Sequence, residues 1–167
     1  MKTELILGGA RSGKSRYALD QALAHAGPVA WLATAEARDE EMRERIVRHQ
    51  AERPAHWSTT EAPLQLADAL AANQDRFVVV DCLTLWLSNW LCREDTAGWT
   101  AERQAFLREI AAERQAPLLL VSNEVGFGIV PENALARQFR DEAGRLHQDI
   151  ARQLDADKHH FAPTRLI

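Results

Sequence analysis

A short glycine-rich segment near the N-terminus constrains the fold of this chain more than any other feature. Residues 8–15 read Gly-Gly-Ala-Arg-Ser-Gly-Lys-Ser, which fits the pattern G-x-x-x-x-G-K-S/T. The apolar run of residues 5–7 precedes the segment, and a stretch typical of a helix follows it. In that context, loop N–H groups and the positive N-terminal end of the helix surround phosphates. The segment therefore predicts a P-loop that binds a nucleoside triphosphate.

Each residue type in the predicted P-loop has a physical role. Gly8 and Gly13 allow the tight turn that points successive N–H groups at the phosphates. Lys14 reaches the outer phosphates as a point charge, and the Ser15 hydroxyl is placed to ligate Mg²⁺. The predicted phosphate-binding residues are Gly8, Gly9, Ala10, Arg11, Ser12, Gly13, Lys14 and Ser15.

A second metal ligand is expected where another apolar run ends in a carboxylate. Residues 77–80 are apolar and are followed by Asp81, the form that the metal-binding strand of P-loop enzymes takes. An ordinary polar residue at a strand end, or a helix cap, is the alternative interpretation. Because a P-loop precedes it in the chain, we expect Asp81 to hold Mg²⁺ together with Ser15.

Short apolar runs alternate with stretches typical of helices, which predicts an α/β fold with a mostly parallel sheet and helices on both faces. The clearest helix begins after Asn133, its expected N-cap. Helices are also expected over residues 36–50 and over residues 100–115, where Thr100 is the expected cap. The predicted strands are residues 5–7, 29–33, 77–80 and 118–121, and the last helix has an apolar stripe of Leu135, Phe139, Ala143, Leu146, Ile150 and Leu154.

Length and composition narrow the class of protein. With 167 residues, 46% of them apolar, the chain is expected to form one domain over residues 1–167. No apolar run approaches the roughly 20 residues that span a bilayer, and no secretory cleavage site is recognised, so we expect a cytoplasmic protein. A net charge of −4 without a basic stripe argues against nucleic acid as the main partner. Cys82 and Cys92 lack metal-ligand spacing and are expected to be free thiols.

Two segments contain further candidate residues. Residues 45–57 hold two histidines and three arginines, and a neutral imidazole such as that of His49 can attack phosphorus. A solvated surface histidine is the alternative. Metal binding by the pair His159-His160 alone is not expected, because stable sites use three or four ligands. After the predicted strand at 118–121, Asn123 and Glu124 are candidates to face a substrate or support the site, with a structural loop as the alternative.

Together, four blocks of sequence resemble the bifunctional adenosylcobinamide kinase and adenosylcobinamide-phosphate guanylyltransferase family of cobalamin biosynthesis. The blocks are residues 8–15, 45–57, 80–84 and 122–133, and the last continues through residues 137–145. The resemblance covers about residues 4–154. It implies a three-layer P-loop fold of the RecA type and a homo-oligomer, specifically a trimer.

The resemblance also implies two reactions on a corrinoid substrate. ATP or GTP first phosphorylates the aminopropanol hydroxyl of adenosylcobinamide. GMP is then transferred from GTP to that phosphate through a guanylylated histidine, giving adenosylcobinamide-GDP and pyrophosphate. The residue aligned with that histidine is His49, and Lys14 serves both reactions. The further nucleotide contacts that the resemblance implies are Thr34, Ala35, Glu36, Ala51, Glu52, Arg53, Pro54, Glu61 and Asp81.

One segment departs from the family, and two other functions stay open. Residues 155–167 are too polar for a buried strand, so we expect the sheet to lack the final strand of the family, which would leave one edge uncovered or change subunit packing. A monofunctional small-molecule P-loop kinase, with His49 only a surface residue, is the first alternative. A nucleotide-dependent switch or motor that responds to a macromolecule is the second. The acidic balance and the length of a single domain favour a transferase.

Overall fold

The computed structural model describes residues 3–156 and 165–167, and these form a parallel sheet with helices on both faces. The strands lie in the order β3-β2-β4-β5-β1-β6, and each neighbouring pair is parallel. The predicted α/β class is therefore confirmed. The strands are β1 (Thr3–Gly8), β2 (Val29–Ala33), β3 (Ser58–Glu61), β4 (Phe77–Asp81), β5 (Leu118–Asn123) and β6 (Arg165–Leu166).

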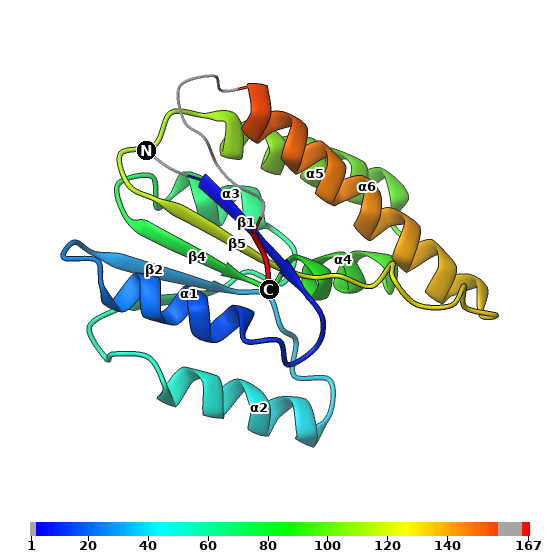
Figure 1. Ribbon diagram of the computed structural model, residues 1–167, viewed down its shortest axis with the longest axis horizontal. Helices are drawn as coiled ribbons and strands as arrows, with labels where there is room; N and C mark the ends of the chain where they lie inside the picture. The colour runs from blue at the N-terminus through cyan, green and yellow to red at the C-terminus, as the bar shows by residue number, and fades with distance from the viewer. Residues whose placement is uncertain (1–2, 157–164) are drawn as a thin grey trace.

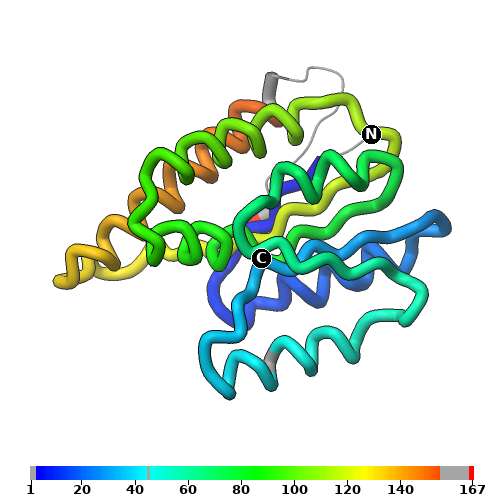
Figure 2. The backbone as a smooth tube through the Cα atoms, turned by 180° about the vertical axis from the view of Figure 1, so that it is seen from behind, coloured from blue at the N-terminus to red at the C-terminus, as the bar shows by residue number. Residues whose placement is uncertain are grey.

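The helices form the outer two layers. Figure 1 shows α1 and α2 on one side of the sheet and the other four helices on the opposite side, and the view from behind in Figure 2 agrees. No helix among the described residues has both the length and the apolar character that a membrane span requires. The helices are α1 (Lys14–Leu23), α2 (Glu40–Ala51), α3 (Leu66–Ala71), α4 (Leu83–Leu91), α5 (Thr96–Ala111) and α6 (Ala134–Ala156).

Two apolar cores pack against the two faces of the sheet. Because successive strand residues point to opposite faces, Val78 and Val80 of β4 enter one core while Val79 enters the other. The larger core holds Trp86 of α4 and Phe106 of α5, whose ring centroids lie 5.0 Å apart. Strands buried on both faces explain why the predicted strands are continuous apolar runs.

Side-chain caps decide where three helices begin. Asn133 Oδ1 accepts a hydrogen bond from the Ala136 N–H at 3.0 Å, so the predicted cap of α6 is confirmed. The prediction that Thr100 caps a helix is wrong, because Asp95 Oδ1 accepts from the Gly98 N–H at 2.8 Å and α5 begins at Thr96. Asp39 caps α2 in the same way, so that helix begins four residues later than predicted.

The C-terminal residues add a strand that the sequence did not predict. Ile6 and Leu7 of β1 pair in parallel with Arg165 and Leu166, and the Ile167 N–H donates to the Leu7 carbonyl at 2.9 Å. The expectation that the sheet lacks a final strand is therefore wrong, because backbone pairing along an edge requires no buried side chain. Leu166 is 65% exposed, in agreement with the expectation that no buried strand forms there. Residues 157–164 of the tail lie outside the described residues.

The last helix supplies a test of the core. Ile150 of α6 is fully buried, so Ile150→Ala should lower the free energy of unfolding by about 2–5 kcal/mol through lost burial and a cavity. Leu23→Ala is the control, because Leu23 is 52% exposed and its loss should cost under about 0.5 kcal/mol. Urea unfolding followed by circular dichroism measures both. Equal effects of the two changes would contradict the packing described here.

Candidate active site

The carboxyl ends of five strands bring the predicted site residues to one edge of the sheet. Gly8 pairs with Asn123 across β1 and β5, and Ala33 of β2 pairs with both Asp81 of β4 and Glu61 of β3. Thr34 directly follows Ala33. Open α/β sheets bind their ligands at this edge. Residues up to 115 positions apart in the chain therefore lie along one edge of the sheet.

The predicted P-loop is a tight turn between β1 and α1. Gly13 has a φ of 97° and Arg11 a φ of 57°, both in the left-handed region. A glycine adopts this region without strain, whereas an arginine there is uncommon. Lys14 is buried, and its Nζ donates to the Gly9 carbonyl at 2.5 Å and to Ser12 Oγ at 3.3 Å. The ammonium group is thus held over the turn, where phosphate oxygens can replace these acceptors.

Ser15 and Asp81 meet across the sheet edge. The Ser15 hydroxyl donates to Asp81 Oδ1 at 3.3 Å, although β5 lies between the strands that lead to these residues. Among the described residues, no cluster of three or more His, Cys, Asp and Glu side chains is able to hold a metal ion. Mg²⁺ needs no such cluster, because it commonly takes one or two protein oxygens beside water and substrate phosphates. The pair therefore fits the chemistry of a nucleotide-bound magnesium.

The carboxyl group of Asp81 lies among positive groups. Burial raises its pKa, and the charge of His49, the charge of Arg53, the hydrogen bond from Ser15 and the charge of Lys14 act in the opposite direction. A buried carboxylate of this kind is stabilised by any cation that approaches it. The α2 histidine is thus near enough to Asp81 for its charge to act on that carboxyl group.

Arg53 is held by aromatic rings just beyond α2. Its guanidinium carbon lies 4.5 Å from the centroid of the Trp31 ring, and Trp31 stacks on Trp57 with ring centroids 6.3 Å apart. Burial lowers the pKa of Arg53, and its buried Nη1 has no hydrogen-bond partner among the described residues. A buried donor without a partner is costly, and a phosphate oxygen would satisfy it.

His49 has a carboxylate beside one ring nitrogen. Its Nδ1 lies 3.7 Å from Glu52 Oε2, and its side chain is 38% exposed. Of the other predicted nucleotide contacts, Ala35 and Glu36 follow the carboxyl end of β2 and Glu61 ends β3, whereas Ala51, Glu52 and Pro54 lie at the end of α2 and just beyond it. Ala35, Glu36 and Pro54 are half-buried, Ala51 and Glu52 are exposed at the end of α2, and Glu61 is exposed at the end of β3. His159 and His160 lie outside the described residues.

Asn123 and Glu124 join the end of β5 to its neighbours. Asn123 Nδ2 donates to Thr84 Oγ1 at 3.1 Å, and the Glu124 N–H donates to the Gly8 carbonyl at 2.9 Å. Sequence reasoning did not single out Thr84, although it belongs to the block of residues 80–84. It also missed a buried pair below this point, in which Ser122 Oγ and His147 Nε2 lie 2.8 Å apart. A histidine in the apolar stripe region of α6 was the only signal for that pair.

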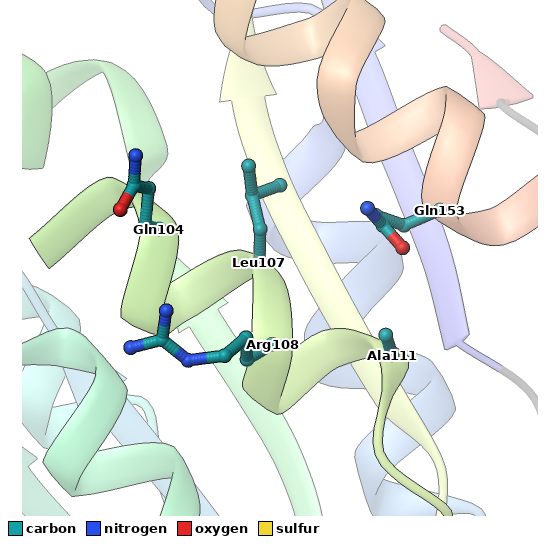
Figure 3. Close-up of a pocket in the computed structure, with 5 residues that line it drawn as sticks. All are labelled: Gln104, Leu107, Arg108, Ala111 and Gln153. Carbon is teal, nitrogen blue, oxygen red and sulfur yellow. The ribbon is translucent and has the colours of Figure 1, made fainter. Parts of the chain in front are cut away.

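A surface pocket lies elsewhere and takes no part in this arrangement. Figure 3 shows that α5 and α6 line it, at the end of α5 that leads into the amino end of β5. The P-loop and Asp81 lie at the opposite, carboxyl edge of the sheet. The lining residues are Gln104, Leu107, Arg108, Ala111 and Gln153.

Comparison with known proteins points to one family. The family described as cobinamide kinase / cobinamide phosphate guanyltransferase matches residues 4–162. The bifunctional adenosylcobalamin biosynthesis protein CobP of Pseudomonas aeruginosa is 49% identical over 154 residues, covering 91% of this chain and 88% of the relative. The bifunctional adenosylcobalamin biosynthesis protein CobU of Salmonella typhimurium is 41% identical over 165 residues (90% and 91%), and that of Escherichia coli is 40% identical over 163 residues (88% of each).

The Ser122–His147 pair predicts a pH dependence of stability. Burial lowers the pKa of His147 below its ordinary value of 6.5, so the unfolded chain takes up this proton more readily than the folded one. The contribution is therefore complete above pH 6.5 and is lost as the pH falls through the lowered pKa of the folded state. We expect the wild type to lose more unfolding free energy than His147→Gln between about pH 7.5 and pH 5.5.

Chemical unfolding at the two pH values measures this difference. The change in unfolding free energy of the variant is subtracted from that of the wild type. This difference removes the contributions of carboxylates, which titrate at lower pH in both proteins. Identical pH profiles for wild type and variant would show that His147 is not held in its neutral form.

Proposed function

We propose that this chain, which belongs to the cobinamide kinase / cobinamide phosphate guanyltransferase family, catalyses two successive reactions on a corrinoid. In the first, ATP or GTP phosphorylates the hydroxyl of adenosylcobinamide. In the second, GTP gives its GMP group to the new phosphate. The observation that carries this proposal is that a P-loop lysine and an oxygen pair suited to Mg²⁺ lie at one sheet edge, with a histidine near enough for its charge to act on Asp81.

The kinase step needs positioning and charge neutralisation more than covalent chemistry. The substrate hydroxyl oxygen attacks the outermost phosphorus, the bond to the bridging oxygen breaks, and the nucleoside diphosphate leaves while the hydroxyl releases its proton to solvent. Lys14 stabilises the negative charge on the transferred group. Ser15 and Asp81 would hold Mg²⁺, which when bound neutralises charge on the phosphate oxygens.

The transfer step uses His49 as a nucleophile. A ring nitrogen attacks the innermost phosphorus of GTP, the bond to the next phosphate breaks, and pyrophosphate leaves. A phosphate oxygen of the corrinoid then attacks the same phosphorus and releases the histidine. Glu52 Oε2 lies 3.7 Å from Nδ1, where its negative charge favours a proton on that nitrogen, so we propose Nε2 as the attacking atom.

The nucleotide is held by the loops around this edge. We propose that the buried, unpartnered Nη1 of Arg53 donates to a phosphate oxygen, which the approach of Arg53 to Asp81 supports. Asn123 pairs with Gly8, the first residue of the P-loop, and is therefore placed to support that loop. The further contacts in the proposal are Thr34, Ala35, Glu36, Ala51, Glu52, Pro54, Glu61 and Glu124.

We further propose a homo-oligomer, with the trimer that the family resemblance implies. The connection between β5 and α6 projects away from the sheet in Figures 1 and 2. It exposes apolar side chains that a second copy would cover: Phe127 is 84% exposed, Ile129 97% and Val130 59%. The cytoplasm, where a supply of both nucleotides is expected, stays the predicted location.

A monofunctional kinase is the second candidate function. The observation that favours it is the high exposure of α2, none of whose described side chains is buried. A histidine on such a helix is commonly a solvated surface residue. Separate assays of the two reactions discriminate the two functions.

Removal of His49 should separate the two activities. His49→Asn should lower guanylyl transfer by more than about 1000-fold while phosphorylation of adenosylcobinamide is retained, because only the transfer passes through the imidazole. His56→Asn is the matched control, since this neighbouring histidine is exposed and has no role in the proposal. Unchanged transfer in His49→Asn would show that transfer does not pass through His49, whereas a wild type that phosphorylates the corrinoid but transfers no GMP would leave the monofunctional kinase.

Labelled GTP gives a direct test of the intermediate. GTP labelled at its innermost phosphorus should leave acid-labile, alkali-stable label on the wild type and on His56→Asn, because a phosphoramidate has that stability. His49→Asn should carry no label. Active wild-type enzyme that never becomes labelled would remove His49 from the mechanism.

Changes at the P-loop and at Asp81 should affect both reactions together. Lys14→Ala and Asp81→Asn should each lower kcat/KM of both reactions by at least about 100-fold, because both displacements need the same charge neutralisation. Asp81→Asn should also raise the Mg²⁺ concentration needed for half-maximal rate. The control is Asp20→Asn on α1, whose carboxylate pairs with Arg16 at the surface. A variant of Lys14 that turns over nucleotide normally would contradict the proposed site.

A further inference from the structure

One buried amide in α4 connects two segments that carry predicted nucleotide contacts. Asn89 is 3% exposed, and its Nδ2 donates to the Thr34 carbonyl at 2.7 Å and to the Pro63 carbonyl at 3.0 Å. Thr34 follows β2, and Pro63 follows β3. Both hydrogens of the amide are used, so Asn89 ties the exits of two neighbouring strands to α4.

Thr34 extends this connection to the metal-binding strand. Its Oγ1 donates to the Cys82 carbonyl at 2.7 Å and accepts from the Cys82 N–H at 2.9 Å. Cys82 directly follows Asp81, and Thr34 is fully buried. The position of the loop after β2 is therefore set relative to Asp81 on one side and relative to α4 on the other.

Arg38 closes the loop after β2 from its solvent side. Its Nη2 donates to Asn89 Oδ1 at 3.0 Å and to Glu36 Oε2 at 3.0 Å, and its Nη1 donates to Cys92 Sγ at 3.1 Å. Arg93 adds a second cation 3.4 Å from Glu36 Oε1. The planar guanidinium thus connects the loop to α4 and to the residue after α4 in one fixed geometry.

The composition of α4 shows that packing alone does not require this amide. The helix reads Leu-Thr-Leu-Trp-Leu-Ser-Asn-Trp-Leu, and most of it is buried in the larger core. An apolar side chain at position 89 would bury more apolar surface at no cost in hydrogen bonding of its own. Asn89 instead directs both of its amide hydrogens at loop carbonyls and accepts a hydrogen bond from Arg38 at its oxygen.

We propose that Asn89 and Arg38 are positioning residues that hold residues 34–36 in the conformation that binds the nucleotide. Neither touches a reacting group, and both act through the loop after β2. The inference rests on the proposed function, in which residues 34–36 contact GTP. In this proposal the hydrogen bonds of Asn89 and Arg38 increase the affinity for GTP and leave the rate of the chemical steps unchanged.

The test compares KM with kcat for guanylyl transfer. Asn89→Ala should raise the KM for GTP by about tenfold with kcat nearly unchanged, because lost loop positioning weakens binding in the ground and transition states alike. Asn89→Asp should raise KM further, since its carboxylate would face two carbonyl oxygens that need a donor. Equilibrium binding of GTP to each variant should weaken by the same factors as KM.

Arg38 gives a second variant that does not depend on the core. Arg38→Gln changes an arginine whose side chain is 44% exposed, so the protein should fold normally even if Asn89→Ala does not. We expect the KM for GTP to rise about fivefold. Arg38→Lys should behave like Arg38→Gln, because a single ammonium does not reproduce the planar fork. The double change of Arg38 and Asn89 should raise KM by less than the product of the single effects.

Asn73→Ala is the matched control for general loss of stability. Its Nδ2 also donates to a backbone carbonyl, that of Ala69, but at the amino end of β4, away from the site. This variant should lower Tm and leave the KM for GTP unchanged. If Asn89→Ala and Arg38→Gln lower Tm but keep the wild-type KM, the positioning role is overturned. If the wild type itself neither binds GTP nor transfers GMP, the proposed function fails instead.

Discussion

The contact between Ser15 and Asp81 depends on the position of β5, and the rest of the site depends on that contact. β5 lies between β1 and β4, so the strand that leads to the P-loop and the strand that ends in Asp81 are separated by one strand. Parallel pairing aligns the ends of these strands on one edge. The Ser15 hydroxyl then reaches the carboxylate at 3.3 Å, and in the proposed function these two side chains would hold Mg²⁺.

Burial strengthens the electrostatic interactions between the charged groups of this edge, because little water screens them. Lys14, Arg53 and Asp81 are buried to different degrees. Burial lowers the pKa of the two cations and raises that of the carboxyl group, which in each case favours the neutral form. Opposite charges near one another favour each other's charged forms, and in the proposed function a triphosphate with its metal would add further charges of both signs. Charges held in this way are oriented before the reaction begins, which is the main source of electrostatic catalysis. His49 is only half-buried, with 38% of its side chain exposed, and in the proposed function it attacks a different phosphorus.

Local sequence patterns predicted the parts of the fold that are strongly periodic or chemically distinctive. The four strands at residues 5–7, 29–33, 77–80 and 118–121 were found because strands covered on both faces are apolar throughout. The polar strand β3 was missed, since an edge strand is stabilised by backbone pairing and needs no apolar residues. The same reason explains β6. Asp95 displaced the expected cap at Thr100 because both residue types cap helices and only the fold decides between them.

The sequence by itself determined the chemistry of the P-loop, the carboxylate at Asp81, the candidate nucleophile His49 and the family to which the chain belongs. These follow from residue types at fixed local spacings. Only the tertiary structure decided that Asn89 and Arg38 hold the loop after β2, that Arg53 rests on Trp31, and that Ser122 meets His147. Such contacts join residues 22 to 55 positions apart, and their geometry exists only once the strands are paired and the helices are packed against them.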